Sequence, residues 1–383
     1  MANFLVLVNA WYSKTLRTGG EYHMLRVLKR WSLQHKISLI LPKIGYEASK
    51  QMLPNVKLFY FSSTENDKKE INSLLKLMFS YFIRVVRSIF ISPKDKPDII
   101  ITASHLLYDI IPAIILCRKY NSKLVVYNHG VWGPYRSYKE GLRSNLMLLN
   151  EKLSIYLCNR SADVIFVINS EIRDFLIHKG YDANKITIMR NGIEHELIEL
   201  VKGGPKKYEA CFCARLVKRK GVYDLLDVWS EIIKYFPESK LVIVGEGEEH
   251  NGLCRTIVKK GLEKNISLTG YVPDKEKISI FKSSKVFVYP SYEESWGITV
   301  TEAMACGLPV ISYNLSAYNF LRSGIIKLDT GNKKLMETTI KDLLSNDNQR
   351  EELGRRAREE SKRLDWEDIS EEELKVVTKL LDS

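Results

Sequence analysis

Short runs of apolar and β-branched residues alternate with longer amphipathic stretches along this chain. Apolar runs of this kind are typical of strands buried on both faces of a parallel sheet, with helices as the crossover connections. In the first half we expect strands at 4–9, 37–41, 56–61, 99–102, 124–128 and 164–168, and helices at 22–34 and 72–91. The pattern predicts a parallel α/β fold.

A polar segment at 201–207 interrupts this alternation and has the composition of a linker. A second series then predicts strands at 208–214, 241–244, 266–268, 286–289 and 309–311, and a helix at 223–235. We therefore expect one Rossmann-like domain over 1–200 and another over 201–365. A last helix, with a capping signal at Ser370 and Glu373, would join residues 366–383 to the first domain.

Composition describes an ordinary globular protein. The 383 residues are 45% hydrophobic, with 21 Gly and 11 Pro, and are enough for two cores. The longest nearly uncharged run, 106–117, contains Asp109 and Pro112 and is shorter than the ~20 residues of a spanning helix. The first residues predict a buried strand and lack the features of an export signal, so we expect a cytoplasmic protein.

The cysteines lack the paired spacing of a zinc site and lie in or beside apolar segments. They are Cys117, Cys158, Cys211, Cys213, Cys254 and Cys306. We expect all six to be reduced residues of the core, with Cys211 and Cys213 on the same face of one strand.

The formal net charge of +12 belongs almost entirely to the first half. Residues 1–200 carry 28 Lys and Arg against 17 Asp and Glu, whereas the remainder carries 30 against 29. A one-sided positive field favours an anionic surface or ligand, either phospholipid or nucleic acid. Solubilising lysines without a partner are the alternative.

The segment 288–311 holds the strongest candidate for a ligand site. It predicts a strand, then a turn, then a helix that starts near Gly297, with Glu294 on the loop and Glu302 more than one turn inside the helix. The first turn of a helix has unpaired N–H groups and favours negative charge, so the amides of Gly297, Ile298 and Thr299 could bind a diphosphate. Solvated carboxylates before an ordinary helix are the alternative.

Cations stand on another predicted loop, between Cys213 and Gly221. Arg215 and Lys220 on this loop would complement the two charges of a diphosphate and stabilise it as a leaving group. A basic run such as this is otherwise most often a solvated loop.

These segments, with the motifs at 191–193, 244–247 and 270–272, resemble the retaining glycosyltransferases of family 4 (glycosyl transferases group 1). The resemblance covers nearly the whole chain and is strongest over 208–312. It implies the GT-B fold, in which two Rossmann-like domains with parallel sheets face one another across an interdomain cleft.

The same resemblance implies roles for individual residues. Arg215 and Lys220 would bind the donor diphosphate, Glu294 would position the hydroxyls of the transferred sugar, and Glu302 would hold the ribose. The other donor-binding residues implied in this half are Gly245, Tyr271, Val272, Gly297, Ile298 and Thr299.

In the first half, Gly19 and Gly20 follow the first predicted strand and precede a helix, where a backbone can approach a ligand closely. They resemble the glycine-rich loop of the family, although a plain turn fits them almost as well. His129 ends a predicted strand and corresponds to a histidine that lies beside the transferred sugar in the family. A structural role for this histidine is the alternative.

The resemblance implies a retaining enzyme that transfers a hexose from a UDP- or GDP-sugar to a glycan or lipid-linked acceptor. The departing phosphate would deprotonate the acceptor hydroxyl; a covalent glycosyl-enzyme is the alternative. No Asp-x-Asp motif stands in a metal-binding context, so we expect no metal and no cofactor beyond the nucleotide-sugar, which is a co-substrate.

The predicted helix at 72–91 gathers Lys76, Ser80, Arg84 and Arg87 in one sector and leaves apolar residues elsewhere. Such a helix could lie in the interface of an anionic membrane, as part of a peripheral contact on its cytoplasmic face. The alternative is a crossover helix buried against the first sheet, with one stripe exposed to solvent. Positive charge near the expected acceptor entrance comes from Arg136, Lys139 and Arg143.

Other functions are weaker alternatives. A glycogen-synthase-like enzyme or a sugar epimerase could share the fold, and a Lys-x-Gly-Gly motif would favour the former, but residues 17–20 read Arg-Thr-Gly-Gly. A basic nucleic-acid-binding protein would need interleaved aromatic residues or a reading helix, and neither occurs, so we expect no nucleic-acid partner. A catalytically inactive sensor is disfavoured by the presence of both glutamates and both cations. The base, the sugar, the linkage and the oligomeric state are left open.

Overall fold

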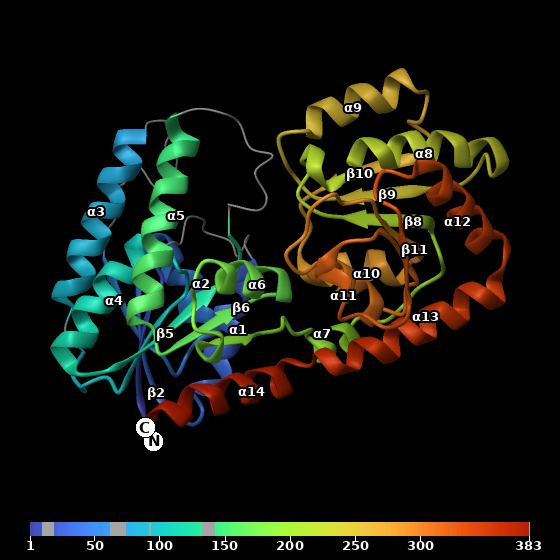
Figure 1. The fold of residues 1–383 in the computed structure, drawn as a ribbon. Helices are drawn as coiled ribbons and strands as arrows, with labels where there is room; N and C mark the ends of the chain where they lie inside the picture. Colours follow the sequence, from blue (N-terminus) through green and yellow to red (C-terminus); the bar gives the residue numbers. More distant parts are fainter. Residues whose placement is uncertain (10–18, 62–73, 92, 132–141, 383) are drawn as a thin grey trace. The chain divides into compact units, whose positions relative to one another are not determined.

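The computed structural model describes residues 1–9, 19–61, 74–91, 93–131 and 142–382. The chain forms two compact units. Unit 1 consists of Met1–Asn191 together with Trp366–Ser383, and unit 2 of Gly192–Asp365. Figure 1 shows the course of the chain by colour, with the last helix of the sequence belonging to unit 1.

Unit 1 contains a seven-stranded parallel sheet in the order β3-β2-β1-β4-β5-β6-β7. The strands are β1 (Asn3–Leu7), β2 (Lys36–Pro42), β3 (Lys57–Phe61), β4 (Ile99–Thr102), β5 (Lys123–Asn128), β6 (Val164–Val167) and β7 (Ile186–Ile188). The central strands are buried along nearly their whole length because helices cover both faces of the sheet.

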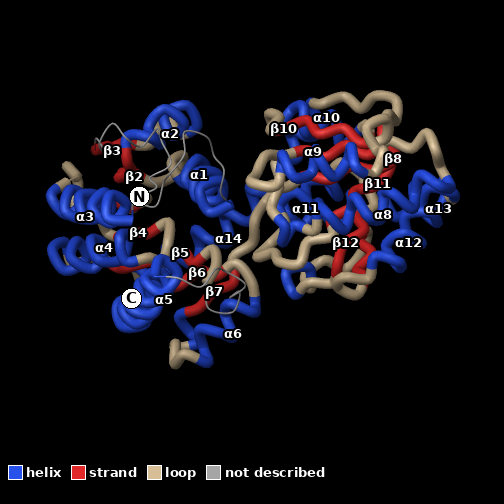
Figure 2. The backbone as a smooth tube through the Cα atoms, turned by 90° about the horizontal axis from the view of Figure 1, so that it is seen from above, coloured by secondary structure: helices blue, strands red, loops and turns tan. Residues whose placement is uncertain are grey.

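The helices of unit 1 form two layers. They are α1 (Gly19–Trp31), α2 (Tyr46–Met52), α3 (Leu74–Phe90), α4 (Leu107–Tyr120), α5 (Leu142–Ser161), α6 (Ser170–His178) and α14 (Trp366–Thr378), with short 3₁₀ turns at Lys43–Gly45, Ala183–Lys185 and Lys379–Leu381. Helices α3, α4 and α5 lie side by side against one face of the sheet, and α1 and α14 pack together against the other (Figure 2).

Helix α14 is held to unit 1 by buried polar groups. Glu373 accepts a hydrogen bond of 2.8 Å from the Tyr127 hydroxyl and lies 3.1 Å from His23 Nε2. Burial opposes a charge on His23, but the Glu373 carboxylate outweighs it and raises the pKa of His23. The predicted capping box is therefore wrong: the helix begins at Trp366, Ser370 lies inside it, and Glu373 anchors it to α1 and β5.

Unit 2 contains a six-stranded parallel sheet in the order β10-β9-β8-β11-β12-β13. The strands are β8 (Tyr208–Cys213), β9 (Leu241–Val244), β10 (Ile266–Gly270), β11 (Ser284–Tyr289), β12 (Val310–Tyr313) and β13 (Ile325–Leu328). The helices are α7 (His195–Leu200), α8 (Val222–Tyr235), α9 (His250–Lys259), α10 (Asp274–Lys282), α11 (Ile298–Ala305), α12 (Lys333–Ser345) and α13 (Asp347–Ser361), with 3₁₀ turns at Lys218–Lys220, Ser316–Tyr318 and Lys362–Leu364. Helices α8, α9 and α12 cover one face, and α10, α11 and α13 the other (Figure 1).

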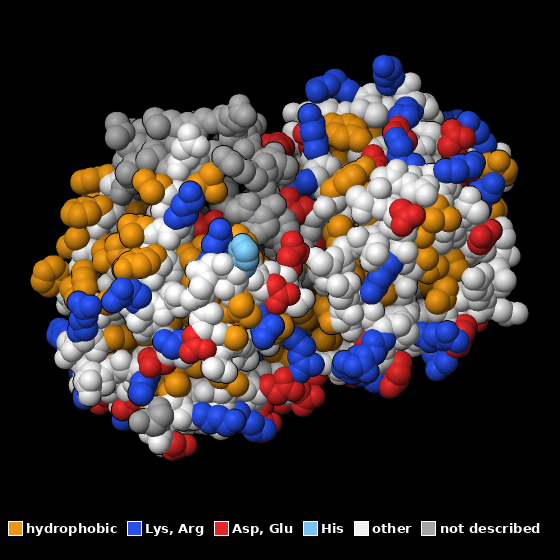
Figure 3. Space-filling model, viewed as in Figure 1, with side chains coloured by type: hydrophobic (Ala, Val, Ile, Leu, Met, Phe, Trp, Pro, Cys, Tyr) orange, Lys and Arg blue, Asp and Glu red, His pale blue; other side chains and the backbone are white. Residues whose placement is uncertain are grey.

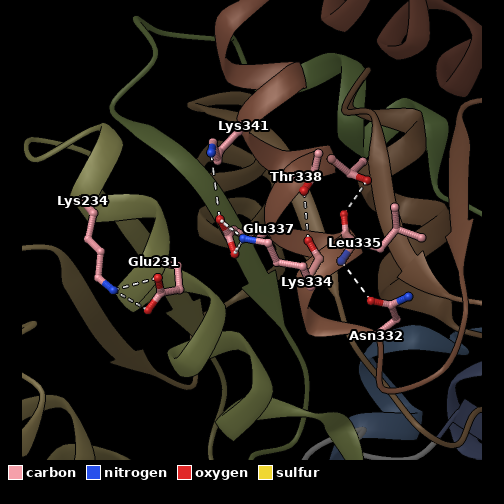
Figure 4. A network of polar contacts seen from close by, with 9 residues as sticks. Glu231, Lys234, Asn332, Lys334, Leu335, Glu337, Thr338 and Lys341 are labelled. Atoms are coloured by element: carbon pink, nitrogen blue, oxygen red, sulfur yellow. Dashed lines mark hydrogen bonds and ion pairs between the residues drawn. The ribbon is translucent and has the colours of Figure 1, made fainter.

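Helix α12 contains a buried carboxylate and contacts α8 through a lysine that pairs with it. Glu337 is 4% exposed, and Lys334 Nζ donates to both of its oxygens at 3.0 and 3.1 Å. Lys341 Nζ lies 3.9 Å from the same carboxylate (Figure 4). It also lies 3.2 Å from the ring centroid of Tyr235, at the end of α8. The two lysines compensate the buried negative charge, so this cluster stabilises the helical layer and lies away from any predicted site residue.

The division between the units falls at Asn191, before the predicted boundary at residue 200. Helix α7, which the sequence places in the first domain, belongs to unit 2, where Lys282 Nζ donates to the carbonyls of Ile198 and Val201 at 2.5 and 2.6 Å. The polar segment 201–207 therefore lies inside unit 2 and does not link the units. Composition alone does not distinguish a surface loop from a linker.

The predicted strands match observed ones to within two residues at either end, which confirms the parallel α/β fold. Two edge strands were missed, β7 and β13. Both are only partly buried, so their sequences lack the continuous apolar run of a central strand.

All six cysteines are free thiols, as expected. Cys211 and Cys213 are both buried in β8, and Cys158 is buried in α5. The prediction that every cysteine belongs to the core is wrong for Cys254, which is exposed on α9.

Candidate functional site

The sheet of unit 2 reverses its direction of growth between β8 and β11. From β8 the chain proceeds to β9 and β10 on one side, and from β11 to β12 and β13 on the other. At such a switch point the loops that follow the two strands diverge, and α/β proteins bind ligands at this place, beyond the carboxyl ends of the strands. The two loops that carry the predicted cations and glutamates follow β8 and β11.

Backbone hydrogen bonds join the loops at this edge of the sheet. The N–H of Gly245, after β9, donates to the carbonyl of Gly270 at 2.8 Å, and the N–H of Tyr292, after β11, donates to the carbonyl of Arg219 at 2.9 Å. A Cβ atom at Gly245 would lie 1.9 Å from the Ala214 carbonyl oxygen, so no other residue fits there without a shift of the backbone. Gly245 therefore brings the loops after β8, β9 and β10 together.

Lys220 and Glu294 form an ion pair across the switch point. Lys220 Nζ donates to Glu294 Oε1 and, at 3.0 Å, to the carbonyl oxygen of Glu293. The same Oε1 accepts hydrogen bonds from the Tyr289 hydroxyl at 2.6 Å and from Ser291 Oγ at 3.3 Å. Three donors thus converge on Oε1, and Oε2 receives none of them. The Lys220 and Glu294 side chains are 13% and 11% exposed, so the pair is accessible from solvent but held in place.

Glu302 forms a second ion pair, with a lysine that the sequence analysis did not single out. Lys277 Nζ, on α10, lies 2.9 and 2.8 Å from the two carboxylate oxygens of Glu302 and 3.0 Å from Asp274 Oδ1. Burial opposes the charge on Lys277, but Glu302 and Asp274 outweigh it and raise the pKa of the lysine. Because α10 follows β10, this pair ties the loop after β10 to α11.

Helix α11 begins directly after Gly297, as predicted, with Glu294 before it and Glu302 inside it. Gly297 has φ +87°, a left-handed conformation that favours glycine, and a Cβ atom there would lie 2.7 Å from Tyr318 Cε1. The N–H of Val300 donates to the Gly297 carbonyl, so the first helical amides are those of Ile298 and Thr299. These amides follow Glu294 closely in the sequence and suit an anion.

The other predicted residues of unit 2 differ in exposure. Arg215 follows β8 and is exposed, and its side chain makes no hydrogen bond or ion pair with any other residue that the structure describes. Tyr271 is 58% exposed, whereas Val272 is only 8% exposed and packs in the core. Val272 can therefore contact a ligand through its backbone, and its side chain serves the fold.

In unit 1 the structure brings Gly20 and His129 together. A Cβ atom at Gly20 would lie 2.8 Å from His129 Cδ2, so the glycine allows the start of α1 to pack against the histidine ring. The ring centroid of His129 lies 5.5 Å from that of His23. Burial, followed by the nearby His23 and His105, holds the pKa of His129 well below 6.5, so this histidine is neutral at pH 7.

Several predicted positions lie outside the described part of the chain. Arg136 and Lys139 fall in 132–141, and of Gly19, Lys76 and Arg143 only the helical backbone is described. Within the described residues, no group of three or more His, Cys, Asp or Glu side chains is placed to hold a metal ion. Among these residues no helix is long and apolar enough to cross a bilayer.

The partners of both glutamates were not among the predicted site residues. They are Tyr289 and Ser291 for Glu294 and Lys277 for Glu302. Tyr289 ends a strand that precedes the glutamate loop, a position that could have identified it. Burial, with a contribution from Glu294, raises the pKa of Tyr289, so its hydroxyl stays protonated as a donor. Lys277 stands in a lysine-rich helix, and nothing local distinguishes it from Lys275.

Two family models match consecutive parts of the chain. The model described as Glycosyltransferase Family 4 matches residues 17–197, and the model described as Glycosyl transferases group 1 matches residues 199–360. The two matches meet within ten residues of the division between the units.

Similar proteins carry related descriptions. An uncharacterized glycosyltransferase of Methanocaldococcus jannaschii is 30% identical over 262 residues, which are 64% of this chain and 62% of that protein. A sulfoquinovosyl transferase of Arabidopsis thaliana is 27% identical over 236 residues, 55% of this chain and 44% of that protein. The chain thus spans less than two thirds of the length of both relatives.

Solved structures share the fold along the whole chain. HepE of Anabaena, in a crystal structure with UDP and glucose, has a TM-score of 0.76 at 17% identity and covers 99% of this chain and 100% of its own. Sucrose-phosphate synthase of Thermosynechococcus elongatus has a TM-score of 0.77 at 15% identity, with complete coverage of both chains.

Proposed function

This chain belongs to the group 1 glycosyltransferases with the GT-B fold, and from that premise we propose that it transfers a hexose from a nucleotide-sugar to a hydroxyl of a glycan or lipid-linked acceptor. The observation that carries this proposal is the Lys220–Glu294 pair at the switch point of unit 2. A cation and a carboxylate side by side match the two parts of a sugar diphosphate, which are the charged phosphates and the hydroxyl-bearing ring.

Lys220 would bind the diphosphate. An ammonium group has three N–H donors, and two of them reach Glu294 and the Glu293 carbonyl, which leaves one for a phosphate oxygen. Because Glu294 compensates the charge of Lys220, the net positive charge at the site comes from the exposed Arg215 and from the N-terminus of α11. Together they would stabilise the negative charge that develops on the departing nucleotide.

Glu294 would position the sugar and Glu302 the ribose. The three donors on Glu294 Oε1 orient the carboxylate and leave Oε2 to accept a hydrogen bond from a sugar hydroxyl. Glu302 is oriented in the same way by Lys277. A carboxylate held by other side chains loses little conformational entropy when it binds, which favours a rigid donor site.

For the donor base we favour UDP over GDP, since similar structures contain UDP, UDP-glucose or UDP with glucose. We propose retention of the anomeric configuration, with the departing phosphate accepting the proton of the acceptor hydroxyl. Glu294 is engaged by Lys220, Tyr289 and Ser291, which suits a positioning role better than that of a nucleophile. We also propose that unit 2 binds the donor and unit 1 the acceptor, with Gly19, Gly20 and His129 beside the transferred sugar.

The test is thermal stabilisation of the protein by UDP, GDP, ADP and their sugars, with and without EDTA, followed by product analysis with the base that binds. A ligand that binds only the folded state stabilises it, by about 2.7 kcal/mol at 100 times its Kd. We expect selective stabilisation by UDP and UDP-sugars that EDTA does not change. NMR of the product would establish whether the anomeric configuration is retained.

Glu302→Gln is the informative variant, because it keeps the shape of the side chain. It removes the negative charge that pairs with Lys277 and would accept hydrogen bonds from the ribose hydroxyls. We expect its affinity for UDP to fall about tenfold, the loss of one charge-assisted hydrogen bond. Glu231→Gln is the matched control, since Glu231 forms an exposed ion pair with Lys234 on α8. No response to any nucleotide, or an equal loss in both variants, would contradict the proposed donor site.

A further inference from the structure

Helix α3 presents its apolar side to solvent and its polar side to the interior. Phe79, Phe82 and Phe90 are 62%, 64% and 79% exposed, whereas Ser80 and Arg84 are 8% and 3% exposed. At about 100° per residue the three phenylalanines fall in one stripe, and the polar residues fall on the opposite side. The predicted polar stripe is therefore divided between two environments, since Ser80 and Arg84 are buried whereas Arg87 is exposed.

A network of buried hydrogen bonds sets this rotation of α3. Arg84 Nη1 donates to the Asn9 carbonyl at 2.7 Å, and Ser88 Oγ donates to Asn9 Oδ1 at 3.0 Å. The N–H of Asn9 donates in turn to Asp109 Oδ1 at 2.7 Å, on α4. Turning the apolar side inward would break these bonds and leave the Asn9 carbonyl and Asp109 buried without the Arg84 cation, which is costly. The exposed phenylalanines are therefore a stable feature of the fold.

Helices α4 and α5 extend the same apolar face. On α5, Leu149, Leu153 and Tyr156 follow one another at helical spacing and are 62%, 47% and 56% exposed. On α4, which lies between α3 and α5, Ile115 is 40% exposed. Figure 3 shows hydrophobic side chains gathered over this layer. Soluble monomers rarely expose a large contiguous apolar surface, so this face indicates an interaction surface.

The charges on this face all have one sign. The sequences of α3, α4 and α5 contain only two acidic residues, Asp109 and Glu151, and these are 0% and 3% exposed. Exposed cations are present on all three helices, and they are Arg87, Arg118, Lys119, Lys152 and Arg160. An apolar surface with aromatic residues and only positive charge matches the interface of a bilayer that contains anionic lipids.

We infer that the outward face of α3, α4 and α5 docks on an anionic membrane, with the phenylalanines of α3 inserted at the level of the headgroups. A second copy of this chain fits the face less well. A two-fold interface would place the same surface on both sides, so the cations would oppose one another with no exposed carboxylate on these helices to pair with them. The proposal concerns unit 1 and does not depend on the proposed sugar donor.

The experiment is co-sedimentation of the full chain with vesicles of phosphatidylcholine, with and without phosphatidylglycerol. The double variant Phe79→Ser/Phe82→Ser should lower binding to the anionic vesicles about 100-fold, since insertion of each aromatic side chain contributes about tenfold. Arg118→Ser/Lys119→Ser should lower it by about tenfold and reduce its dependence on salt.

The matched control is Leu200→Ser/Val258→Ser, which removes two side chains that are 76% and 61% exposed in unit 2. This variant should bind vesicles as the unmodified chain does. Circular dichroism and thermal unfolding would show that each variant is folded. Absence of binding to anionic vesicles, or equal binding by all variants, would overturn the proposal. So would light scattering that shows a dimer lost only in Phe79→Ser/Phe82→Ser, which would assign the face to a second copy.

Discussion

Both units place charged side chains at the switch point of their sheets, but at different depths. In unit 2 the Lys220–Glu294 pair lies between β8 and β11 and remains partly exposed. In unit 1 the corresponding place, between β1 and β4, is bordered by Asn9 and by Asp109, which is completely buried and linked to Arg84 through Asn9.

This difference shows that one topological position can serve two purposes. A partly exposed ion pair can exchange its partners for a ligand at a small cost in free energy, because water can hydrogen-bond to any group that is left without a partner. A buried network cannot do so, since every broken bond leaves an unsatisfied polar group. We therefore interpret the charges of unit 2 as a donor site and those of unit 1 as the anchor that orients α3.

The largest effect is expected from Arg84→Met, which would break the anchor of unit 1. It should lower the free energy of unfolding by about 3–5 kcal/mol, because Asp109 and the Asn9 carbonyl lose their buried cation. Arg87→Met, on the exposed side of the same helix, should change it by less than about 0.5 kcal/mol. Calorimetry of both variants would measure these changes in the free energy of unfolding. A stable Arg84→Met protein without activity would instead place a ligand site in unit 1.

Lys220→Met tests the other half of the comparison. If Lys220 stabilises the leaving diphosphate, as proposed, its removal should lower kcat/KM about 100- to 1,000-fold with little change in thermal stability. Lys218→Met is the matched control, because Lys218 is exposed on the same loop. Steady-state kinetics with the donor identified by binding would measure both. Equal activity of the two variants would remove Lys220 from the donor site.

The third prediction concerns the pH dependence of unit 1. Burial raises the pKa of Asp109 to about 7, against the opposing effects of Ser104, Asn9 and Arg84. Between about pH 4 and 7 the folded state therefore holds a proton that the unfolded state has lost. The free energy of unfolding should fall as pH rises through this window, by at most about 1.4 kcal/mol per pH unit. Asp109→Asn should remove this slope in urea unfolding, and an unchanged slope would assign it to another group.

The smallest effect is expected from Gly297→Ala in unit 2. An alanine at this left-handed position costs about 1–2 kcal/mol, and its Cβ atom would also displace Tyr318 and shift the start of α11. Gly307→Ala is a matched control, because Gly307 has φ +79° and nothing within 4 Å of the added atom. Both should lose the stability that a left-handed alanine costs, and Gly297→Ala should lose more because it displaces Tyr318. Only Gly297→Ala should weaken nucleotide binding, measured by calorimetry.

Much of the fold could be predicted because central parallel strands must be apolar on both faces, which makes their runs visible in a single sequence. The edge strands β7 and β13 were not visible, since their residues are partly exposed. The boundary at Asn191 was not visible because the segment with linker composition, 201–207, lies inside unit 2. The sequence identified Glu294 and Lys220 because each lies on a loop with a recognisable motif. It did not identify Lys277, because the partner of this lysine lies on another helix.

By itself, the sequence determined the alternation of strands and helices, the order of the motifs and the placement of Glu294 before α11 and Glu302 inside it. Only the tertiary structure decided which side of α3 faces water, because a helical stripe of polar residues is equally compatible with solvent and with a buried network. The tertiary structure also decided the role of Glu373. In the sequence this residue resembles part of a helix cap, but in the fold it is the buried partner of His23 and Tyr127. Local sequence encodes periodicity, but the environment of each face depends on residues distant in the chain.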